Sequence, residues 1–330
     1  MTVDRLALVG AAPDETLEDF GEDVARGLAR PLKRISCRWF YDEKGSALFE
    51  EICGLAEYYP TRAEAEILAA HADDIVRLAG DTATCVELGS GSSVKTRHVL
   101  DAFFRAREDL TYVPIDISPT ALRESADALL GAYPRLDVVG IVGEYGRGFE
   151  WMESQRERRK LVLWLGSNVG NFDRATATDF LATVGRSLGA DDRLLIGVDL
   201  RKDARVLEAA YDDAQGVTAR FNLNVLERIN RELGGTFDLS AFEHEAVYDE
   251  EEGRVAIHLV AKRSQTVRIE ALDMTVSFHA DERIHTEDSY KYSPEEIDAL
   301  ARTSGFDVAE RWLDGEERFS VNLLAPRATS

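Results

Sequence analysis

Cysteine is scarce in this chain: only Cys37, Cys53 and Cys85 occur in 330 residues, and no two of them form a CxxC pair. An odd number of isolated cysteines argues against a disulfide framework and fits a reducing cytoplasm. Long apolar runs are also missing, since no segment approaches the ~18 residues that a membrane span requires. The first twenty residues turn acidic too soon for a secretory signal peptide. We therefore expect a cytoplasmic protein that does not insert into a membrane.

Basic residues are in the minority as well. Lys and Arg number 39 against 61 Asp and Glu, which gives a net charge of −22. This excess of negative charge argues against nucleic acid or an anionic membrane as the main partner, because both are polyanions. The 6 histidines form neither an HExxH motif nor a Cys/His cluster, so we expect no metal site. No feature of the sequence indicates an obligate protein partner.

Strand-like and helix-like runs alternate between residues 64 and 200. The predicted strands are apolar throughout and cover residues 84–88, 110–117, 136–142, 161–166 and 193–200. The predicted helices between and around them cover residues 63–78, 94–104, 119–130 and 174–188. Continuous apolar strands are typical of parallel strands buried on both faces, and their alternation with helices indicates a doubly wound α/β sheet.

The alternation breaks between residues 201 and 291. A mostly helical stretch at 202–233 precedes strand-like segments, which cover residues 244–248, 255–261 and 274–284. Residues 292–330 then return to a helix, 294–303, and two closing strands. We therefore predict an α/β core of residues 64–200 and 292–330, with a second, inserted α+β lobe of residues 1–63 and 201–291. The lobe includes an aromatic-rich segment, residues 38–62, which either packs a helical cap or supplies tyrosines to a ligand.

A glycine-rich turn, Glu87 to Ser93, follows the first core strand. Such a turn lets a ligand approach the backbone closely and directs helix N–H groups at it. A P-loop and a dinucleotide fingerprint each require a further glycine where this chain has Val94, so both readings are weak. S-adenosylmethionine is the third ligand that such a turn can bind.

Acidic residues at the ends of successive strands favour S-adenosylmethionine. Glu87 stands beside Gly89 and Gly91 after the first core strand, and Asp116 ends the second. Glu144 and Tyr145 follow the third. The carboxyl ends of parallel strands form the ligand edge of a doubly wound sheet, and a carboxylate there can accept from both hydroxyls of a ribose.

Two further segments have both a functional and a purely structural interpretation. Gly166 to Asn171 follows the fourth core strand and is either an ordinary turn or a loop that faces the substrate. Glu287 and Ser289 point the same way on an extended chain, where a carboxylate and a hydroxyl could hold a pair of ring N–H groups. A solvated edge strand would explain the same pattern.

Long ordered motifs give the chain a family resemblance. They are WFYDEKGSALFEEI, EYYPTRAEAEIL, ELGSGSSVKTR, LGSNVGNF, LEAAYDDAQGVTARFNLNVL and HTEDSYKYSPEEI. These motifs resemble the L-histidine Nα-methyltransferases of ergothioneine biosynthesis, from about residue 20 to the end of the chain. The resemblance implies a Rossmann-type class I methyltransferase core with a substrate-binding lobe. It also implies trimethylation of the histidine α-amino group by S-adenosylmethionine to give hercynine.

The resemblance further implies a role for each matching residue. Cofactor contacts fall on Gly89, Lys95, Asp116, Glu144 and Tyr145, which join Glu87 and Gly91 of the glycine-rich turn. Substrate contacts fall on Tyr41, Phe49, Tyr58, Gly166, Asn168, Asn171, Tyr211, Ile257, Glu287 and Ser289. Of these, Asn171 and Tyr211 would hold the carboxylate and Glu287 and Ser289 the imidazole. Tyr41 and Tyr58 are the residues expected nearest the chemistry.

Several of these positions differ from the common family pattern. Glu144 and Tyr145 replace an aspartate and a phenylalanine, and Asn168 and Ile257 replace a threonine and a methionine on the substrate side. The same fold acting on another amino acid or an aromatic amine is therefore an alternative. A non-catalytic protein that binds cofactor or histidine is another, and a nicotinamide oxidoreductase is a distant one.

Overall fold

The computed structural model describes residues 5–10 and 17–327, and the chain divides into two compact units. The first unit takes the described residues of 1–14, 60–201 and 292–330, and the second those of 15–59 and 202–291. This division differs from the predicted one at the N-terminus. Strand β1 (Leu6–Val9) pairs in parallel with β5 (Leu136–Val142), so it belongs to the first unit and not to the inserted lobe. An edge strand offers unpaired backbone groups that such a short segment can complete.

The first unit contains an eight-stranded sheet in the order β1-β5-β4-β3-β6-β7-β14-β13. Its remaining strands are β3 (Thr84–Leu88), β4 (Leu110–Asp116), β6 (Lys160–Trp164), β7 (Arg193–Asp199), β13 (Phe306–Leu313) and β14 (Phe319–Pro326). The strands run parallel from β1 to β7, and the last two form an antiparallel edge. This is the predicted doubly wound α/β sheet, which is thereby confirmed.

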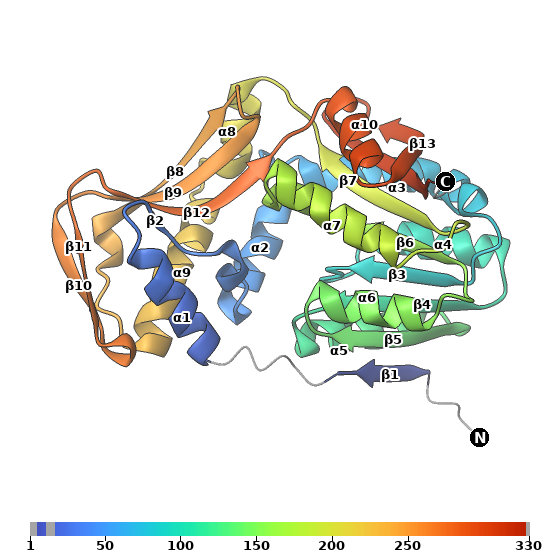
Figure 1. Ribbon diagram of the computed structural model, residues 1–330, viewed down its shortest axis with the longest axis horizontal. Coiled ribbons are helices and arrows are strands. Elements are labelled where there is room, and N and C mark those ends of the chain that lie inside the picture. Colours follow the sequence, from blue (N-terminus) through green and yellow to red (C-terminus); the bar gives the residue numbers. More distant parts are fainter. Residues whose placement is uncertain (1–4, 11–16, 328–330) are drawn as a thin grey trace. The chain divides into compact units, whose positions relative to one another are not determined.

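Helices cover both faces of this sheet, with α6 and α7 in front and α3 and α4 behind in Figure 1. They are α3 (Pro60–Ala79), α4 (Thr96–Ala106), α5 (Pro119–Ala132), α6 (Tyr145–Ser154), α7 (Arg174–Arg186) and α10 (Pro294–Thr303). The predicted starts of α5 and α10 are confirmed, because Ser118 accepts from the N–H of Ala121 and Ser293 forms a capping box with Glu296. Helix α6 was not predicted.

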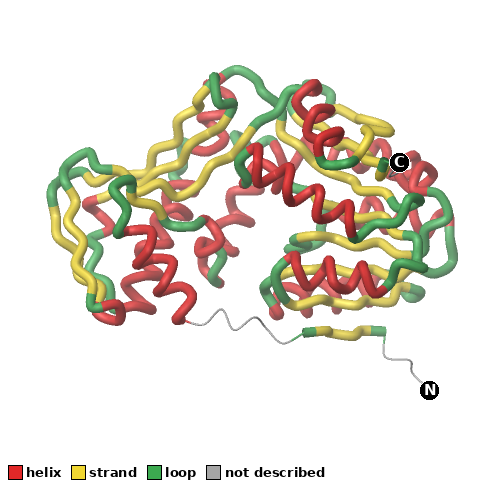
Figure 2. The backbone as a smooth tube through the Cα atoms, viewed as in Figure 1, coloured by secondary structure: helices red, strands yellow, loops and turns green. Residues whose placement is uncertain are grey.

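The second unit contains a four-stranded sheet in the order β2-β12-β9-β8 and a separate hairpin, β10-β11. The strands are β2 (Lys33–Arg34), β8 (Phe242–Asp249), β9 (Arg254–Ala261), β10 (Gln265–Ile269), β11 (Met274–Phe278) and β12 (Arg283–Tyr290). The single strand predicted at 274–284 is wrong: the chain reverses at Asp281, whose φ of 65° is left-handed, so β11 and β12 are separate. Figure 2 shows these strands as yellow segments.

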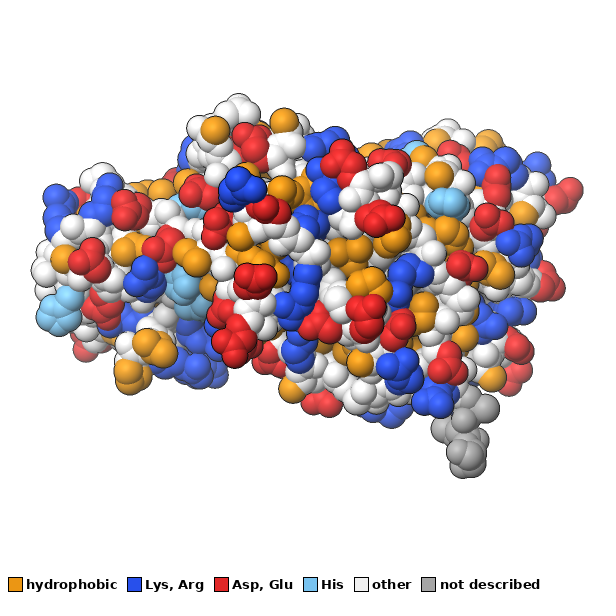
Figure 3. Space-filling view, turned by 90° about the horizontal axis from the view of Figure 1, so that it is seen from above, with side chains coloured by type: hydrophobic (Ala, Val, Ile, Leu, Met, Phe, Trp, Pro, Cys, Tyr) orange, Lys and Arg blue, Asp and Glu red, His pale blue; other side chains and the backbone are white. Residues whose placement is uncertain are grey.

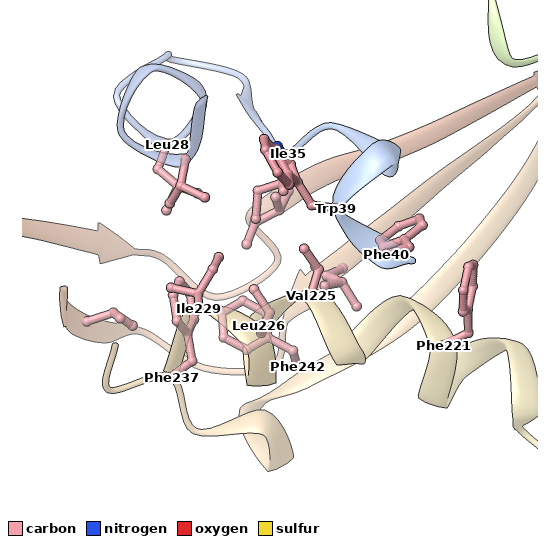
Figure 4. Packing of buried hydrophobic residues seen from close by; sticks show 14 of the residues in the cluster. Leu28, Ile35, Trp39, Phe40, Phe221, Val225, Leu226, Ile229, Phe237 and Phe242 are labelled. Carbon is pink, nitrogen blue, oxygen red and sulfur yellow. The ribbon is translucent and has the colours of Figure 1, made fainter. Parts of the chain in front are cut away.

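Helices of the second unit pack around one apolar core. The helices are α1 (Leu17–Leu28), α2 (Glu43–Cys53), α8 (Ala204–Tyr211) and α9 (Val217–Leu233), with the 3-10 turns η1 (Cys37–Phe40), η3 (Leu239–Ala241) and η4 (Glu270–Leu272). Figure 4 shows side chains of α9 such as Val225 and Ile229 pointing at Leu28, Ile35 and Trp39.

Charged side chains of both signs are mixed on the surface in view. Figure 3 shows Lys and Arg interspersed with Asp and Glu on the face in view, so the negative charge is not gathered there into one acidic patch. No helix among residues 5–10 and 17–327 combines the length and the apolar character needed to cross a membrane. The same residues include no group of three His, Cys, Asp or Glu side chains arranged to hold a metal ion.

Candidate active site

The glycine-rich turn leaves β3 in a conformation that favours glycine. Gly89 and Gly91 have φ values of 70° and 48°, which are left-handed and costly for residues with a Cβ. A Cβ built on Gly89 would lie 3.1 Å from the hydroxyl of Tyr145, whereas one on Gly91 would meet nothing within 4 Å. The N–H groups of Gly89 and Ser90 donate to the carbonyl oxygen of Ile115 at 2.9 and 3.2 Å. The turn is therefore held against β4 while its Gly91 side remains open.

Asp116 ends β4 beside this turn. Its carboxylate accepts from the N–H of Gly91 and from that of Ser118, each at 3.0 Å. A carboxylate has about four acceptor positions, so these two bonds leave capacity for the hydroxyls of a ligand. The N–H of Gly143 donates to the carbonyl of Asp116 at 2.9 Å, which places the end of β5 next to that of β4.

The strand ends carry a polar set that fits an adenosyl ligand. Ser90 Oγ is buried and has no hydrogen-bond partner within the described structure, which is costly unless a ligand completes it. Glu144 is exposed and Tyr145 is half-buried at the start of α6, where the Tyr145 ring packs 5.2 Å from that of Phe180. Together with Asp116 and the open side of Gly91, these groups could hold the hydroxyls and base of S-adenosylmethionine.

Glu87 supports the turn from within the protein. Its buried carboxylate accepts from Thr96 Oγ1 at 2.7 and 2.8 Å and from the hydroxyl of Tyr112. Burial raises the pKa of Glu87 to about 7, although these two hydrogen bonds oppose the shift. Glu87 thus connects β3 to the first turn of α4, and its expected contact with the cofactor stays a prediction.

Glu64 joins two loops of the first unit and was not predicted as a functional residue. This fully buried side chain on α3 pairs with Lys95 and accepts from the N–H of Gly166 at 2.8 and 3.0 Å. A Cβ on Gly197 would fall only 1.8 Å from Glu64 Oε1, so a glycine is required there. In the sequence, Glu64 resembles any acidic residue of an amphipathic helix, and nothing marks it as buried.

We expect Glu64→Gln to lower the free energy of unfolding by about 2 kcal/mol, because it removes the charge that pairs with Lys95 inside the protein. Thermal and urea unfolding would measure the change. The matched control is Glu66→Gln on the same helix, where the side chain is exposed and accepts from the N–H of Gly315. An equal loss in the two variants would contradict this role for Glu64.

The loop after β6 lies beside the glycine-rich turn. Gly166 and Ser167 adopt left-handed φ values of 77° and 58°, and Ser167 Oγ accepts from the N–H of Asp199 at 3.0 Å. This fixes the turn η2 (Asn168–Asn171) that follows. The amide nitrogen of Asn168 would lie 3.5 Å from a Cβ on Gly89. The structure therefore brings Gly166, Asn168 and Lys95 together with the predicted cofactor residues, whereas Asn171 is exposed.

Aromatic rings of the second unit form a continuous row. The ring centroids of Tyr41 and Phe49 lie 5.6 Å apart, those of Phe49 and Tyr58 6.3 Å, and those of Tyr58 and Tyr211 6.0 Å. Phe221 on α9 packs against both Tyr41 and Phe49. The structure thus brings three predicted substrate residues of one segment together with Tyr211, which is distant in the sequence. Aromatic faces of this kind suit a cationic or methylated amine.

Strand β12 presents Glu287 and Ser289 two residues apart, as the extended-chain argument predicts. Glu287 stands opposite Ile257 on β9, and an irregularity between His285 and Glu287 precedes this regular register. Ser289 and Ile257 are buried and Glu287 is half-buried, while Asp288 between them binds Arg254 at 2.8 Å. The segment is therefore not a solvated edge strand.

Burial raises the pKa of Glu287 to about 7, while the positive charge of Lys291 opposes the shift. Since the pKa of the folded state exceeds the ordinary value, the folded protein holds a proton between about pH 4.5 and 7 that the unfolded chain releases. This group therefore destabilises the ligand-free protein increasingly as the pH rises through that window.

Glu287→Gln is accordingly expected to stabilise the ligand-free protein at pH 8 by about 2 kcal/mol, allowing for partial exposure of the side chain. At pH 4.5 the variant and the parent should be nearly equal. Urea unfolding at the two pH values would measure the difference. A variant no more stable than the parent at pH 8 would show that Glu287 ionises there without cost.

Tyr211 ends α8 and is fixed from both sides. Its hydroxyl lies 2.8 Å from Ser289 Oγ, and its carbonyl accepts from His244 Nε2 at 2.7 Å. The other ring nitrogen of His244 then accepts from Asn222 Nδ2 at 2.9 Å, and burial lowers the pKa of this histidine, so the imidazole is neutral. His244 and Asn222 were not predicted, because only the folded chain brings them to α8.

The carboxylate of Asp213 caps the next helix, α9, through the N–H groups of Val217 and Thr218.

Tyr58 is a neutral phenol in this environment. Burial, and then the neighbouring Tyr211, hold the pKa of Tyr58 well above its usual value. A phenolate base at neutral pH is thereby disfavoured, and Tyr58 can act through its hydroxyl as a hydrogen-bonding group. Asn171 belongs to the first unit and Tyr211 to the second, so their joint hold on one carboxylate stays a prediction.

Known proteins resemble this chain over nearly its full length. The family described as "Histidine-specific methyltransferase, SAM-dependent" matches residues 20–326. A histidine N-alpha-methyltransferase of Mycolicibacterium smegmatis is 41% identical over 94% of this chain and 96% of the relative. One of Mycobacterium tuberculosis is 41% identical over 92% of this chain and 94% of the relative.

A fungal relative is longer than this chain. Ergothioneine biosynthesis protein 1 of Neurospora crassa is 34% identical over 86% of this chain, which matches only 32% of that protein. The family match and the two bacterial relatives each span most of the chain. The chain belongs to the S-adenosylmethionine-dependent, histidine-specific methyltransferase family.

Proposed function

We propose that this protein transfers three methyl groups from S-adenosylmethionine to the α-amino group of L-histidine, which gives hercynine. The observation that carries the proposal is the pair Glu287 and Ser289, presented side by side on β12 with Ile257 opposite. A carboxylate and a hydroxyl at this spacing suit the two ring nitrogens of an imidazole. An aliphatic neighbour suits the ring face.

The first unit would hold the cofactor. Asp116 would accept from the ribose hydroxyls, Glu144 and Tyr145 would lie near the adenine, and the open side of Gly91 would admit the rest. Lys95, fixed by Glu64, would contribute a positive charge beside Gly166. When bound, S-adenosylmethionine supplies an electrophilic methyl group on a sulfonium sulfur.

The second unit would orient the amino acid. Glu287 and Ser289 would bind the imidazole, and the hydroxyl of Tyr211 would donate to the carboxylate, for which Asn171 is the further candidate. The row of Tyr41, Phe49 and Tyr58 would surround the amine, whose successive methyl groups and fixed charge aromatic faces tolerate. Displacement at a methyl group needs alignment and a neutral amine more than any covalent nucleophile.

Tyr58→Phe is expected to lower kcat/KM by about 10-fold, because the variant loses one hydrogen bond near the amine. A general base would contribute 100-fold or more, but the raised pKa keeps Tyr58 protonated. Initial rates of product formation across pH 7 to 9.5 would measure the effect. A loss of 1,000-fold, together with a missing limb of the pH profile, would contradict this and identify Tyr58 as the base.

A direct test is incubation with S-adenosylmethionine and L-histidine, followed by mass spectrometry and fragmentation of the product. The proposal predicts histidine carrying three methyl groups, all on the α-nitrogen. Methylation of a ring nitrogen would contradict the proposed orientation. The compartment is part of the same proposal, since Cys37, Cys53 and Cys85 form no disulfide within the described structure, as expected in a reducing cytoplasm.

A further inference from the structure

Lys291 is a fully buried lysine directly after β12, and none of the proposed roles accounts for it. Its Nζ donates to the hydroxyl of Tyr211 and to Ser289 Oγ, each at 2.7 Å. The two hydroxyl oxygens lie 2.8 Å from each other, so the three atoms form a closed triangle. The same nitrogen lies 4.5 Å from the centroid of the Tyr211 ring.

A buried amine of this kind is costly for folding. Removing a cation from water costs several kcal/mol, and an apolar side chain of similar volume often serves a protein core at least as well. Both hydroxyls that accept from Lys291 are ones for which we propose substrate contacts. The protein therefore buries the charge of Lys291, despite its desolvation cost, beside the hydroxyls where the carboxylate of the substrate is expected.

The hydrogen-bond pattern explains what the charge does there. Lys291 can only donate, so both hydroxyl oxygens accept from it. Their mutual bond uses one of the two hydroxyl hydrogens, and the other points away from the lysine. A hydroxyl that accepts from a cation becomes a stronger donor, because bonds in a chain polarise one another. The triangle thus favours an acceptor with negative charge.

The carboxylate of Glu287 makes a positive charge necessary at this site. It lies two residues from Ser289 on the same face of β12, so a bound amino acid would bring its carboxylate near another carboxylate. Like charges at short range in a buried site repel strongly. The cation of Lys291, directly after this strand, offsets this repulsion and lets one site hold an imidazole and a carboxylate together.

We propose that Lys291 is a positioning residue that places a positive charge behind Tyr211 and Ser289 and so makes recognition depend on the substrate's carboxylate. This inference rests on the proposed function. It identifies the substrate class as free amino acids with an intact carboxylate and excludes amines that lack it.

The test compares L-histidine with histamine, which lacks the carboxylate. Affinities for both are measured by calorimetry in the presence of S-adenosylhomocysteine, for the parent and for Lys291→Met. We expect the variant to lose 10-fold or more in affinity for L-histidine and to change by less than 3-fold for histamine. Equal losses for both ligands, or no loss for L-histidine, would overturn the proposal.

Two further variants complete the test. Lys262→Met removes an exposed lysine of the same unit and should leave both affinities unchanged. Tyr211→Phe removes only the hydroxyl between Lys291 and the carboxylate, so it should reproduce the selective loss even if Lys291→Met fails to fold. If Tyr211→Phe weakens both ligands equally, the proposal is wrong.

Failure of the proposed function would appear earlier and differently. In that case the parent itself would neither bind nor methylate L-histidine, whatever the variants do. A parent that binds L-histidine and loses no carboxylate selectivity on Lys291→Met would leave the proposed function standing and refute only the role of the lysine.

Discussion

Glu287→Gln will weaken the binding of L-histidine by about 30-fold or more and leave the affinity for S-adenosylhomocysteine unchanged. The variant keeps the shape of the side chain but loses its charge. A hydrogen bond to a charged group is worth about 1.5 to 3 kcal/mol, which corresponds to roughly 10- to 150-fold in affinity. The half-buried position of Glu287 and its raised pKa place the expected effect within that range.

The pH dependence provides a second readout for the same variant. Because the pKa of free Glu287 is about 7, the parent should bind L-histidine more tightly as the pH rises through 7, and Glu287→Gln should lose this contribution. Glu251→Gln, an exposed acidic residue of the β8–β9 turn, is the matched control. Unchanged histidine affinity in Glu287→Gln would remove the basis for assigning histidine as the substrate.

Asp116→Ala will weaken the binding of S-adenosylhomocysteine by about 100-fold or more. The substitution removes the acceptor for the N–H groups of Gly91 and Ser118, which loosens the turn, and also the proposed acceptor for two ribose hydroxyls. Two charge-assisted bonds of about 1.5 kcal/mol each already account for a loss of about 3 kcal/mol. Calorimetric titration of the ligand-free protein measures this directly.

Asp137→Ala is the matched control for this second variant. Asp137 is an exposed residue of β5 in the same unit, and its removal should change the affinity by less than 3-fold. If Asp116→Ala also stays within 3-fold, the cofactor does not bind at the end of β4, and the strand-end argument fails with it.

The sequence was most informative where local pattern and position coincide. The apolar runs predicted β3 and β5 to the residue, and the predicted starts of helices 119–130 and 294–303 coincide with those of α5 and α10. The alternation of a strand predicted that Glu287 and Ser289 share a face. Each of these depends on neighbours a few residues away, which the sequence itself contains.

Features that depend on distant neighbours were not predictable in this way. Glu64 pairs with Lys95 across 31 positions, and Lys291 meets Tyr211 across 80. Neither residue is unusual for its own segment, because helices and strand ends commonly carry charges. Strand β1 was missed for a similar reason, since four residues show little periodicity and only the open edge of β5 selects them.

The packing of polar groups added structural contacts that the sequence pattern did not show. Glu87 was expected to contact the cofactor, and its carboxylate also accepts from Thr96 and Tyr112. Asp213 lies within one of the motifs that carry the family resemblance, and its carboxylate caps α9. Residue type and position alone predicted neither of these contacts.

The most direct test of the central claim is product analysis from an equimolar mixture of the twenty amino acids. The purified protein is incubated with S-adenosylmethionine, and methylated products are identified by mass spectrometry. The account predicts that histidine alone gains methyl groups, up to three. Methylation of a different amino acid would keep the family and the cofactor but contradict the roles of Glu287, Ser289 and Ile257.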